Sequence, residues 1–150
     1  MMKGKSEHAY YMKELMRLMP LADQASRNIF TAERELREAW QTEKAERFRR
    51  VKIELYFICI DCRIHNGELI EAAPLNAKQR RLMRYRYVKG YPWSRLFSTQ
   101  AYSPSHCKRI HRDAVTKIAN NNQSTDFRPM YEELRARMAD LLAEVDEVIE

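Results

Sequence analysis

Residues 93–110 read WSRLFSTQAYSPSHCKRI and contain two short apolar patterns on either side of a Ser-Pro-Ser. Ser103 followed by Pro104 is typical of a helix start, because a serine hydroxyl caps the first turn and proline suits the first helical position. We therefore expect a short helix over 93–100 and a second helix that begins after Ser103. The residues expected to pack the two helices together are Trp93, Leu96, Phe97, Cys107 and Ile110.

A further helix is expected immediately before this pair. Asn76 is a good N-cap, and Gly90 followed by Tyr91-Pro92 ends the segment in a turn. Three helices over 75–119, with a turn of three to four residues before the last, have the layout of a helix-turn-helix. The inward-facing residues of the first helix are predicted to be Leu82, Met83 and Tyr87.

Positive charge is concentrated in this same part of the chain. Residues 75–119 contain eleven Lys and Arg against one acid, Asp113, which is +10, whereas the whole chain carries +6. Such a concentration costs self-repulsion that a polyanionic partner relieves. The charge therefore favours nucleic acid as the partner, and the alternative is a solvated basic face.

The composition predicts an all-α protein, because only three Gly and five Pro accompany many strong helix formers. Residues 1–74 are expected to form a helical N-terminal module and its connector. In it, one helix runs from Ser6 to Met19 and stops at Pro20, and a second starts near Leu21, with Trp40 on its apolar face. A third helix follows with little or no break, and Asn66-Gly67 ends it before a connector over 68–74.

The C-terminal part has the clearest periodicity. After a polar linker over 120–126, apolar residues recur over 127–150 at alternating steps of four and three, which is the spacing of a coiled-coil seam. We expect this helix to make a homo-oligomer, most simply a dimer. The alternative is that it folds back on its own chain. The seam residues are Phe127, Tyr131, Leu134, Met138, Leu141, Val145 and Val148.

In a helix-turn-helix the second helix of the pair lies in the major groove, with its first turns against base edges. Helical spacing directs several polar side chains away from an apolar stripe formed by Cys107, Ile110, Ala114 and Ile118. Arginine can bond guanine O6 and N7 together, and lysine suits phosphates. The candidate DNA-binding residues are Ser103, Ser105, His106, Lys108, Arg109, Arg112, Lys117, Arg95 and Lys89.

The segment LNAKQRRLMRYRYVKGYPWSRLFSTQAYSPSHCKRIHRDAVTKIA resembles region 4 of the sigma-70 family over about 45 residues. It is closer still to the ArpU-like and RinA-like late transcription regulators of phages, which resemble a lone region 4 on an unrelated helical N-terminal part. The resemblance implies a regulator that binds duplex DNA and contacts RNA polymerase. The positions in register are Leu75, Leu82-Met83, Arg86-Tyr87, Gly90, Leu96-Phe97, Ser103, Cys107, Ile110, Ala114-Val115 and Lys117-Ile118.

Two positions depart from the family pattern. Phe97 replaces a small alanine, which implies a wider gap between the two helices. Ala101 replaces the usual Gly or Asn, which implies a turn without a left-handed residue. Residues 1–74 do not resemble the promoter-melting region of a sigma factor, so a complete sigma factor is not expected.

Other chemistry finds little support. Cys59, Cys62 and His65 have a spacing that zinc could use, but a fourth ligand is missing nearby and both cysteines fit an apolar stripe. We therefore expect no metal, no cofactor and no catalytic activity, since the motifs of nucleotide and hydrolytic sites are absent. Tyrosines could stack on single-stranded RNA bases, although most fall at inward or turn positions. The sequence has neither a signal-peptide core nor an apolar run that could span a membrane, which suggests the cytoplasm.

Three functions remain at this level. The first is a sequence-specific, double-stranded DNA-binding transcription regulator of phage or prophage origin. The second is a DNA-packaging protein of the small-terminase type, which also joins a helix-turn-helix to an oligomerisation helix. The third is a protein–protein interaction module that has lost DNA binding.

Overall fold

The computed structural model describes residues 2–100 and 102–149, with side chains from Glu7 onward. The described residues form six helices and no strand, so the all-α prediction is confirmed. The helices are α1 (Met2–Glu38), α2 (Thr42–Ala72), α3 (Ala77–Tyr87), α4 (Trp93–Gln100), α5 (Pro104–Asn121) and α6 (Arg128–Ile149).

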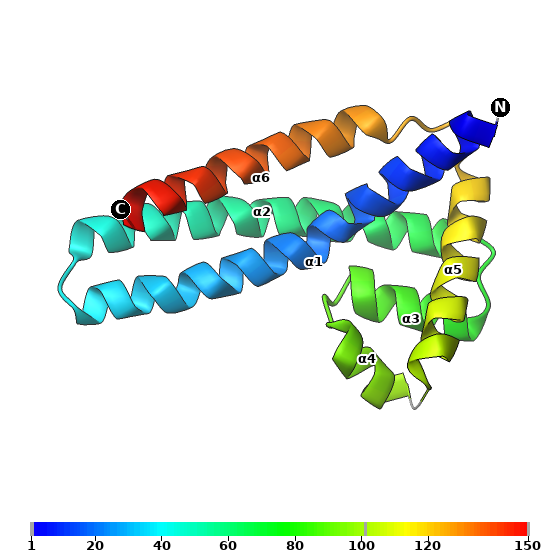
Figure 1. The fold of residues 1–150 in the computed structure, drawn as a ribbon, viewed down its shortest axis with the longest axis horizontal. Coiled ribbons are helices and arrows are strands. Elements are labelled where there is room, and N and C mark those ends of the chain that lie inside the picture. The colour runs from blue at the N-terminus through cyan, green and yellow to red at the C-terminus, as the bar shows by residue number, and fades with distance from the viewer. Residues whose placement is uncertain (1, 101, 150) are drawn as a thin grey trace.

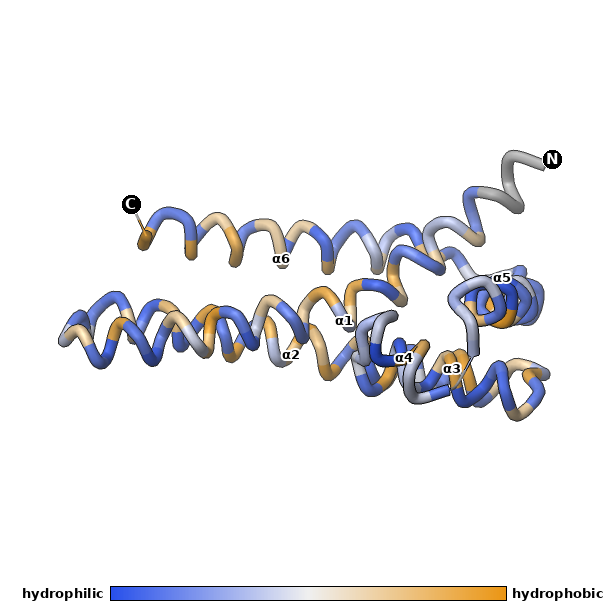
Figure 2. The backbone as a smooth tube through the Cα atoms, turned by 60° about the horizontal axis from the view of Figure 1, so that its bottom comes forward, coloured by the Kyte–Doolittle hydropathy of each residue, from blue (hydrophilic) through white to orange (hydrophobic). Residues whose placement is uncertain are grey.

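Two long helices, α1 and α2, form an antiparallel hairpin, and α6 lies along one side of it (Figures 1 and 2). Helices α3, α4 and α5 gather at the end of the bundle where α1 begins and α2 finishes (Figure 1). One buried cluster runs from the bundle into α3 and α5, where it includes Met83, Tyr87 and Ile118. A second, smaller cluster under α4 consists of Leu82, Leu96, Cys107 and Ile110.

The prediction that Pro20 ends a helix is wrong, because α1 passes through Pro20 without a break. Proline has no N–H, so the carbonyl of Met16, four residues earlier, loses its helical partner. Asn66 replaces that partner from α2: its Nδ2 donates to the Met16 carbonyl at 3.0 Å and to the Tyr87 carbonyl at 2.9 Å. The fully buried Asn66 amide thus binds α1, α2 and the last residue of α3 together.

The prediction that Asn66 and Gly67 end a helix is also wrong, because the amide of Asn66 takes part in this contact between helices. The Asn66 side chain forms tertiary hydrogen bonds, and α2 continues to Ala72. Leu69 and Ile70 in this last part are buried in the main cluster, which stabilises the extra turns. The connector predicted over 68–74 is therefore reduced to residues 73–76.

The prediction that one helix follows another with little or no break after Trp40 is also wrong, because residues 39–41 reverse the chain between α1 and α2. Trp40 has a φ of 62° and is 89% exposed, so it lies in a left-handed turn rather than on an apolar face.

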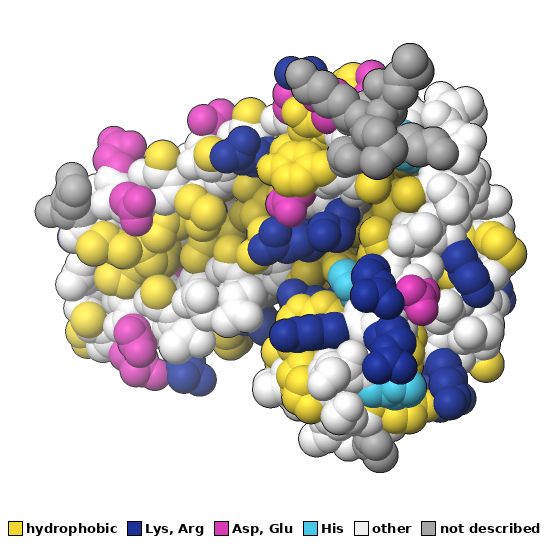
Figure 3. Space-filling model, turned by 45° about the vertical axis from the view of Figure 1, so that its right-hand side comes forward, with side chains coloured by type: hydrophobic (Ala, Val, Ile, Leu, Met, Phe, Trp, Pro, Cys, Tyr) yellow, Lys and Arg dark blue, Asp and Glu magenta, His cyan; other side chains and the backbone are white. Residues whose placement is uncertain are grey.

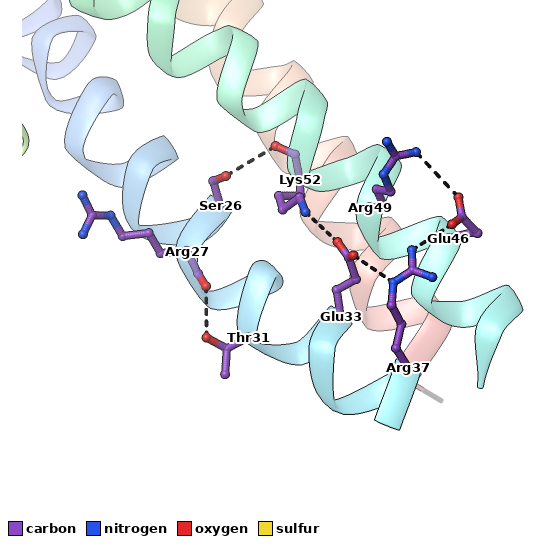
Figure 4. A network of polar contacts seen from close by, with 8 residues as sticks. All are labelled: Ser26, Arg27, Thr31, Glu33, Arg37, Glu46, Arg49 and Lys52. Carbon is purple, nitrogen blue, oxygen red and sulfur yellow. Dashed lines mark hydrogen bonds and ion pairs between the residues drawn. The ribbon is translucent and has the colours of Figure 1, made fainter. Parts of the chain in front are cut away.

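Ion pairs hold the α1–α2 hairpin together near this turn (Figure 4). Glu33 accepts from Lys52 at 2.7 Å and from Arg37 at 3.1 Å, and Arg37 also donates to Glu46 at 2.8 Å. Burial raises the pKa of the Glu33 carboxyl, but the hydrogen bonds from Lys52 and Arg37 outweigh burial and lower it overall.

The seam of α6 packs on its own chain, which is the alternative left open above. Tyr131, Leu134 and Met138 are buried in the main cluster with residues of α1 and α2. These side chains are not available to a second copy, so the predicted self-association through this seam is not what the structure shows. An association through 127–150 would require the exposed residues of α6.

The helix starts predicted at Asn76 and Ser103 are confirmed. Asn76 and Gln79 form a reciprocal capping box, and the Ser103 hydroxyl accepts from the backbone N–H of His106 at 3.2 Å. Gly90, with a φ of 76°, follows α3 as expected. The linker is shorter than predicted, because α5 continues to Asn121.

Candidate nucleic-acid interface

Helix α5 has two faces of different chemistry. One face packs on α3, α4 and the bundle, and its buried residues are Cys107, Ile110, Ala114, Val115, Ile118 and Ala119. The opposite face is exposed and carries Ser105, Lys108, Arg109 and Arg112. Helix α5 lies at one end of the molecule (Figure 1), and since its buried face packs on the rest of the fold, the exposed face is turned to solvent.

Lys and Arg side chains gather over the α4–α5 end of the molecule (Figure 3). Among the residues that the structure describes, Lys108 and Arg109 have no acidic partner within ion-pair distance. Arg112 has its neighbour Asp113 at 3.5 Å, but the two side chains are 73% and 52% exposed, so water weakens this pair. The outward face of α5 therefore stays positive.

The first turn of α5 is partly used for structure. The Ser103 hydroxyl caps the helix, and the His106 ring lies half-buried, edge-on to Tyr102 with ring centres 4.8 Å apart. The Tyr102 ring also lies under Lys78 of α3, whose Nζ is 5.6 Å from the ring centroid. Of the predicted first-turn residues, Ser105 is thus the one with an exposed and uncommitted side chain.

Lys117 is half-buried and donates to Gln79 Oε1 at 3.0 Å, so it ties α5 to the start of α3.

Two arginines of the basic segment, both on α3, pair with an acid from outside the segment. Arg84 lies 3.0 Å and Arg80 3.6 Å from Glu71 of α2. The exposed cations of this segment that have no acid within ion-pair distance among the described residues are Lys78 and Arg81 of α3, Lys89, Arg95 of α4, and Lys108 and Arg109 of α5.

Two stacked tyrosine rings position Lys89 and Arg95, the remaining two predicted DNA-binding residues. The rings of Tyr85 and Tyr91 stack with centres 5.0 Å apart, Lys89 lies 5.0 Å from the Tyr85 centroid, and Arg95 lies 3.8 Å from that of Tyr91. A cation over an aromatic face is positioned without being neutralised. Lys89 and Arg95 are exposed, so both remain able to bind an anion.

Beside the basic face of α5 lies a cluster around His111 that the sequence did not indicate. The Tyr87 hydroxyl and His111 Nε2 are 2.7 Å apart, and the Trp93 ring lies edge-on to His111. Burial lowers the pKa of His111 to about 4, and the nearby charges of Lys13 and Arg86 add to this effect. His111 is therefore neutral near pH 7, and Lys13 of α1 joins the basic surface only because α1 crosses beside α5 (Figure 1).

Of the two departures from the family pattern, the structure bears on one. Phe97 is half-buried, and its ring stacks on Trp93 with centres 6.2 Å apart, so it fills the side of the small cluster. Ala101 lies outside the described residues.

The cysteine-histidine motif lies inside the bundle. Cys59 and Cys62 are buried free thiols, and burial raises the pKa of Cys62 to about 12. Burial lowers the pKa of His65. Over the ranges 2–100 and 102–149, no three His, Cys, Asp or Glu side chains meet in a metal-binding arrangement.

No protein-family model, no curated protein and no solved structure matches this chain. Within the described ranges, none of the helices combines the length and the apolar character that crossing a membrane requires.

Proposed function

We propose that this chain binds double-stranded DNA through α5 and acts as a transcription regulator of the phage type that residues 75–119 resemble. One observation carries the proposal. The exposed face of α5 presents Ser105, Lys108, Arg109 and Arg112 at the end of the molecule, while the opposite face of the same helix is buried.

The dimensions of α5 suit the major groove. Its 18 residues span about 27 Å at a rise of about 1.5 Å per residue. A major groove of about 12 Å width admits one such helix. Arg109 and Arg112 lie three residues apart on the exposed face, so both can reach base edges, where arginine bonds guanine O6 and N7.

The neighbouring cations are arranged to bind the phosphates on either side of that groove. Lys89 and Arg95 are oriented by the Tyr85–Tyr91 stack, and Lys108 is exposed beside Arg109. Contacts of this kind supply affinity and register but not sequence preference. Selectivity then comes from Arg109 and Arg112 of α5, and most of the salt-dependent affinity comes from Lys89, Arg95 and Lys108.

The test compares binding constants for a site selected from a random DNA pool. Arg109→Ala and Arg112→Ala each remove one base contact, so we expect a loss of roughly 5- to 150-fold, because a bidentate contact is worth about 1–3 kcal/mol. Arg137→Ala is the matched control, since Arg137 is an exposed arginine on α6. Fluorescence anisotropy measures all three variants.

Salt separates the two kinds of contact. Lys89→Ala should reduce the slope of log affinity against log salt by about 0.9 and weaken binding to selected and random DNA alike. Arg109→Ala should reduce the preference for the selected site. Unchanged affinity in both variants, or equal losses in Arg137→Ala, would contradict the proposal.

A further inference from the structure

The middle of α2 has a second apolar face that no described part of the chain covers. Phe57 is 56% and Ile64 57% exposed, and both lie at helical spacing with the half-buried Ile53 and Ile60. Two further side chains, Tyr56 of α2 and Phe30 of α1, are each about half exposed and extend this face toward α1. We call these six residues the α2 stripe.

The α2 stripe lies on the open side of the hairpin. Helix α6 covers one side of the α1–α2 pair (Figure 2), and the buried residues of α2, such as Leu55, Ile58 and Cys62, face the core. A helix that is apolar on two faces is normally buried on both. The middle of α2 therefore has the composition of a helix that is covered on both sides.

The exposed apolar area is large enough to act as the centre of an interface. Three aromatic rings of about 150–250 Å² each, half exposed, leave roughly 300 Å², which already equals the largest patch on many monomers. A specific interface buries about 800 Å² on each partner. The three rings alone supply more than a third of that area, and the isoleucines and charged edges of the stripe add to it.

The two edges of the stripe carry opposite charge. Glu54, Asp61 and Glu68 follow one edge at intervals of seven residues, and all three are exposed. Within the described residues none of these acids has an ion-pair partner. The other edge carries Arg49, which is exposed and lies 4.0 Å from Glu46 of the same helix, and the half-buried Arg63 fourteen residues later.

We propose that a second copy of this chain packs on the α2 stripe, with the two α2 helices parallel about a two-fold axis. In a parallel pair the acidic edge of each helix meets the basic edge of the other, so Arg49 lies beside Glu54 of the second copy and Arg63 beside Glu68. An antiparallel pair would place acid against acid. The charges therefore select the parallel arrangement.

This arrangement has a consequence for the proposed function, on which it rests. Helices α3–α5 follow the C-terminal end of α2, so a parallel pair places both copies of α5 at the same end of the dimer (Figure 1). Two-fold dimers of DNA-binding helices contact two half-sites in this way. The DNA site is then expected to be an inverted repeat.

The first experiment measures mass in solution without DNA, by light scattering on the full chain. We expect 36 kDa, twice the 18.0 kDa of one chain, and 18.0 kDa for Phe57→Asp and for Ile64→Asp. Leu142→Asp is the control, because Leu142 is an exposed apolar residue of α6, and it should leave the dimer intact. Circular dichroism verifies that each variant is folded.

A cysteine experiment then tests the direction of packing. In a parallel pair Ile64 meets Ile64 of the second copy, so Ile64→Cys should form an intermolecular disulfide on oxidation, as should Ile53→Cys alone. The native cysteines Cys59, Cys62 and Cys107 are buried and do not compete. In an antiparallel pair the disulfide would instead form between Ile53→Cys and Ile64→Cys chains when these are mixed.

The outcomes separate this inference from the proposed function. A wild-type chain that stays at 18.0 kDa at 100-fold the concentration of the DNA-binding assay, or a dimer that Leu142→Asp dissociates and Phe57→Asp does not, overturns the α2 pairing even if DNA is bound. A mixed Ile53–Ile64 disulfide overturns the parallel direction. A dimer that Phe57→Asp dissociates but that does not bind DNA retains the pairing and removes the proposed function.

Discussion

Positively charged side chains have different neighbours in the bundle and at the α3–α5 end of the molecule. In the bundle, several cations are matched by acids: Arg17 lies 2.9 Å from Glu14, Arg27 3.2 Å from Asp23, and Lys52 2.7 Å from Glu33. At the other end, Arg80 and Arg84 share Glu71 of α2, but Arg95 lies over Tyr91 and Arg86 over Trp93 with no acid within ion-pair distance among the described residues. Ion pairs remove net charge, whereas rings orient a cation and leave its charge intact. The Lys52–Glu33 pair joins α1 to α2 in the hairpin, whereas the cations over rings keep the surface at the other end positive.

The largest effect is expected where the two regions are joined, at Asn66. Asn66→Ala removes the donor to two carbonyls, those of Met16 and Tyr87, and leaving each buried carbonyl unpaired costs about 1–3 kcal/mol. We expect the free energy of unfolding to fall by about 2–5 kcal/mol in urea titrations.

A double-mutant cycle shows whether Pro20 is the cause. Pro20→Ala restores an N–H that can donate to the Met16 carbonyl, so Asn66→Ala should cost about 1–2 kcal/mol less in that background. Equal costs in both backgrounds would mean that Asn66 does not replace the bond lost at Pro20.

The next effect concerns His111, at the centre of the basic end. Its pKa is lowered to about 4 in the folded chain and is about 6.5 when unfolded, so the unfolded chain takes up a proton first as the pH falls. Stability should therefore decline between about pH 6.5 and pH 4, by about 2–3 kcal/mol. His111→Gln, which still allows a hydrogen bond to Tyr87, should remove most of this decline in thermal unfolding across that range. An unchanged pH profile would contradict the assignment.

The smallest effect is expected in the bundle, at Glu33. Glu33→Gln weakens the pairs with Lys52 and Arg37 and should cost about 1–2 kcal/mol at pH 7. Because the pKa of Glu33 is lowered on folding, its stabilisation is present above the ordinary carboxyl pKa of about 4.3 and is lost below it. The difference between wild type and variant should accordingly vanish in acid. Glu46→Gln, at a more exposed member of the same network, should cost less.

Local signals in the sequence were sufficient at the α3–α5 end and insufficient in the bundle. Ser103-Pro104 and Asn76 predicted their helix starts because the capping bonds involve residues three positions apart. Pro20 and Asn66 gave wrong predictions for the opposite reason. Their local tendency to end a helix is overridden by a hydrogen bond between residues 50 positions apart. The heptad pattern of α6 predicted an apolar seam correctly, but periodicity does not tell one's own chain from a second copy.

The candidate site divides in the same way. The exposed face of α5 followed from helical spacing alone, and so did its separation from the buried stripe. The roles of Lys117, bound to Gln79, and of Lys13, near His111, could not be predicted, because each depends on how distant helices cross.

The most direct test of the central claim is methylation interference on a DNA site selected by this protein. Methylation at guanine N7 obstructs the major groove, where the exposed face of α5 is proposed to lie. We predict that N7-methylguanine within each half-site blocks binding by the wild type, and that interference at one guanine disappears in Arg109→Ala. Interference confined to adenine N3, which lies in the minor groove, or a pattern identical in Arg109→Ala, would contradict the account.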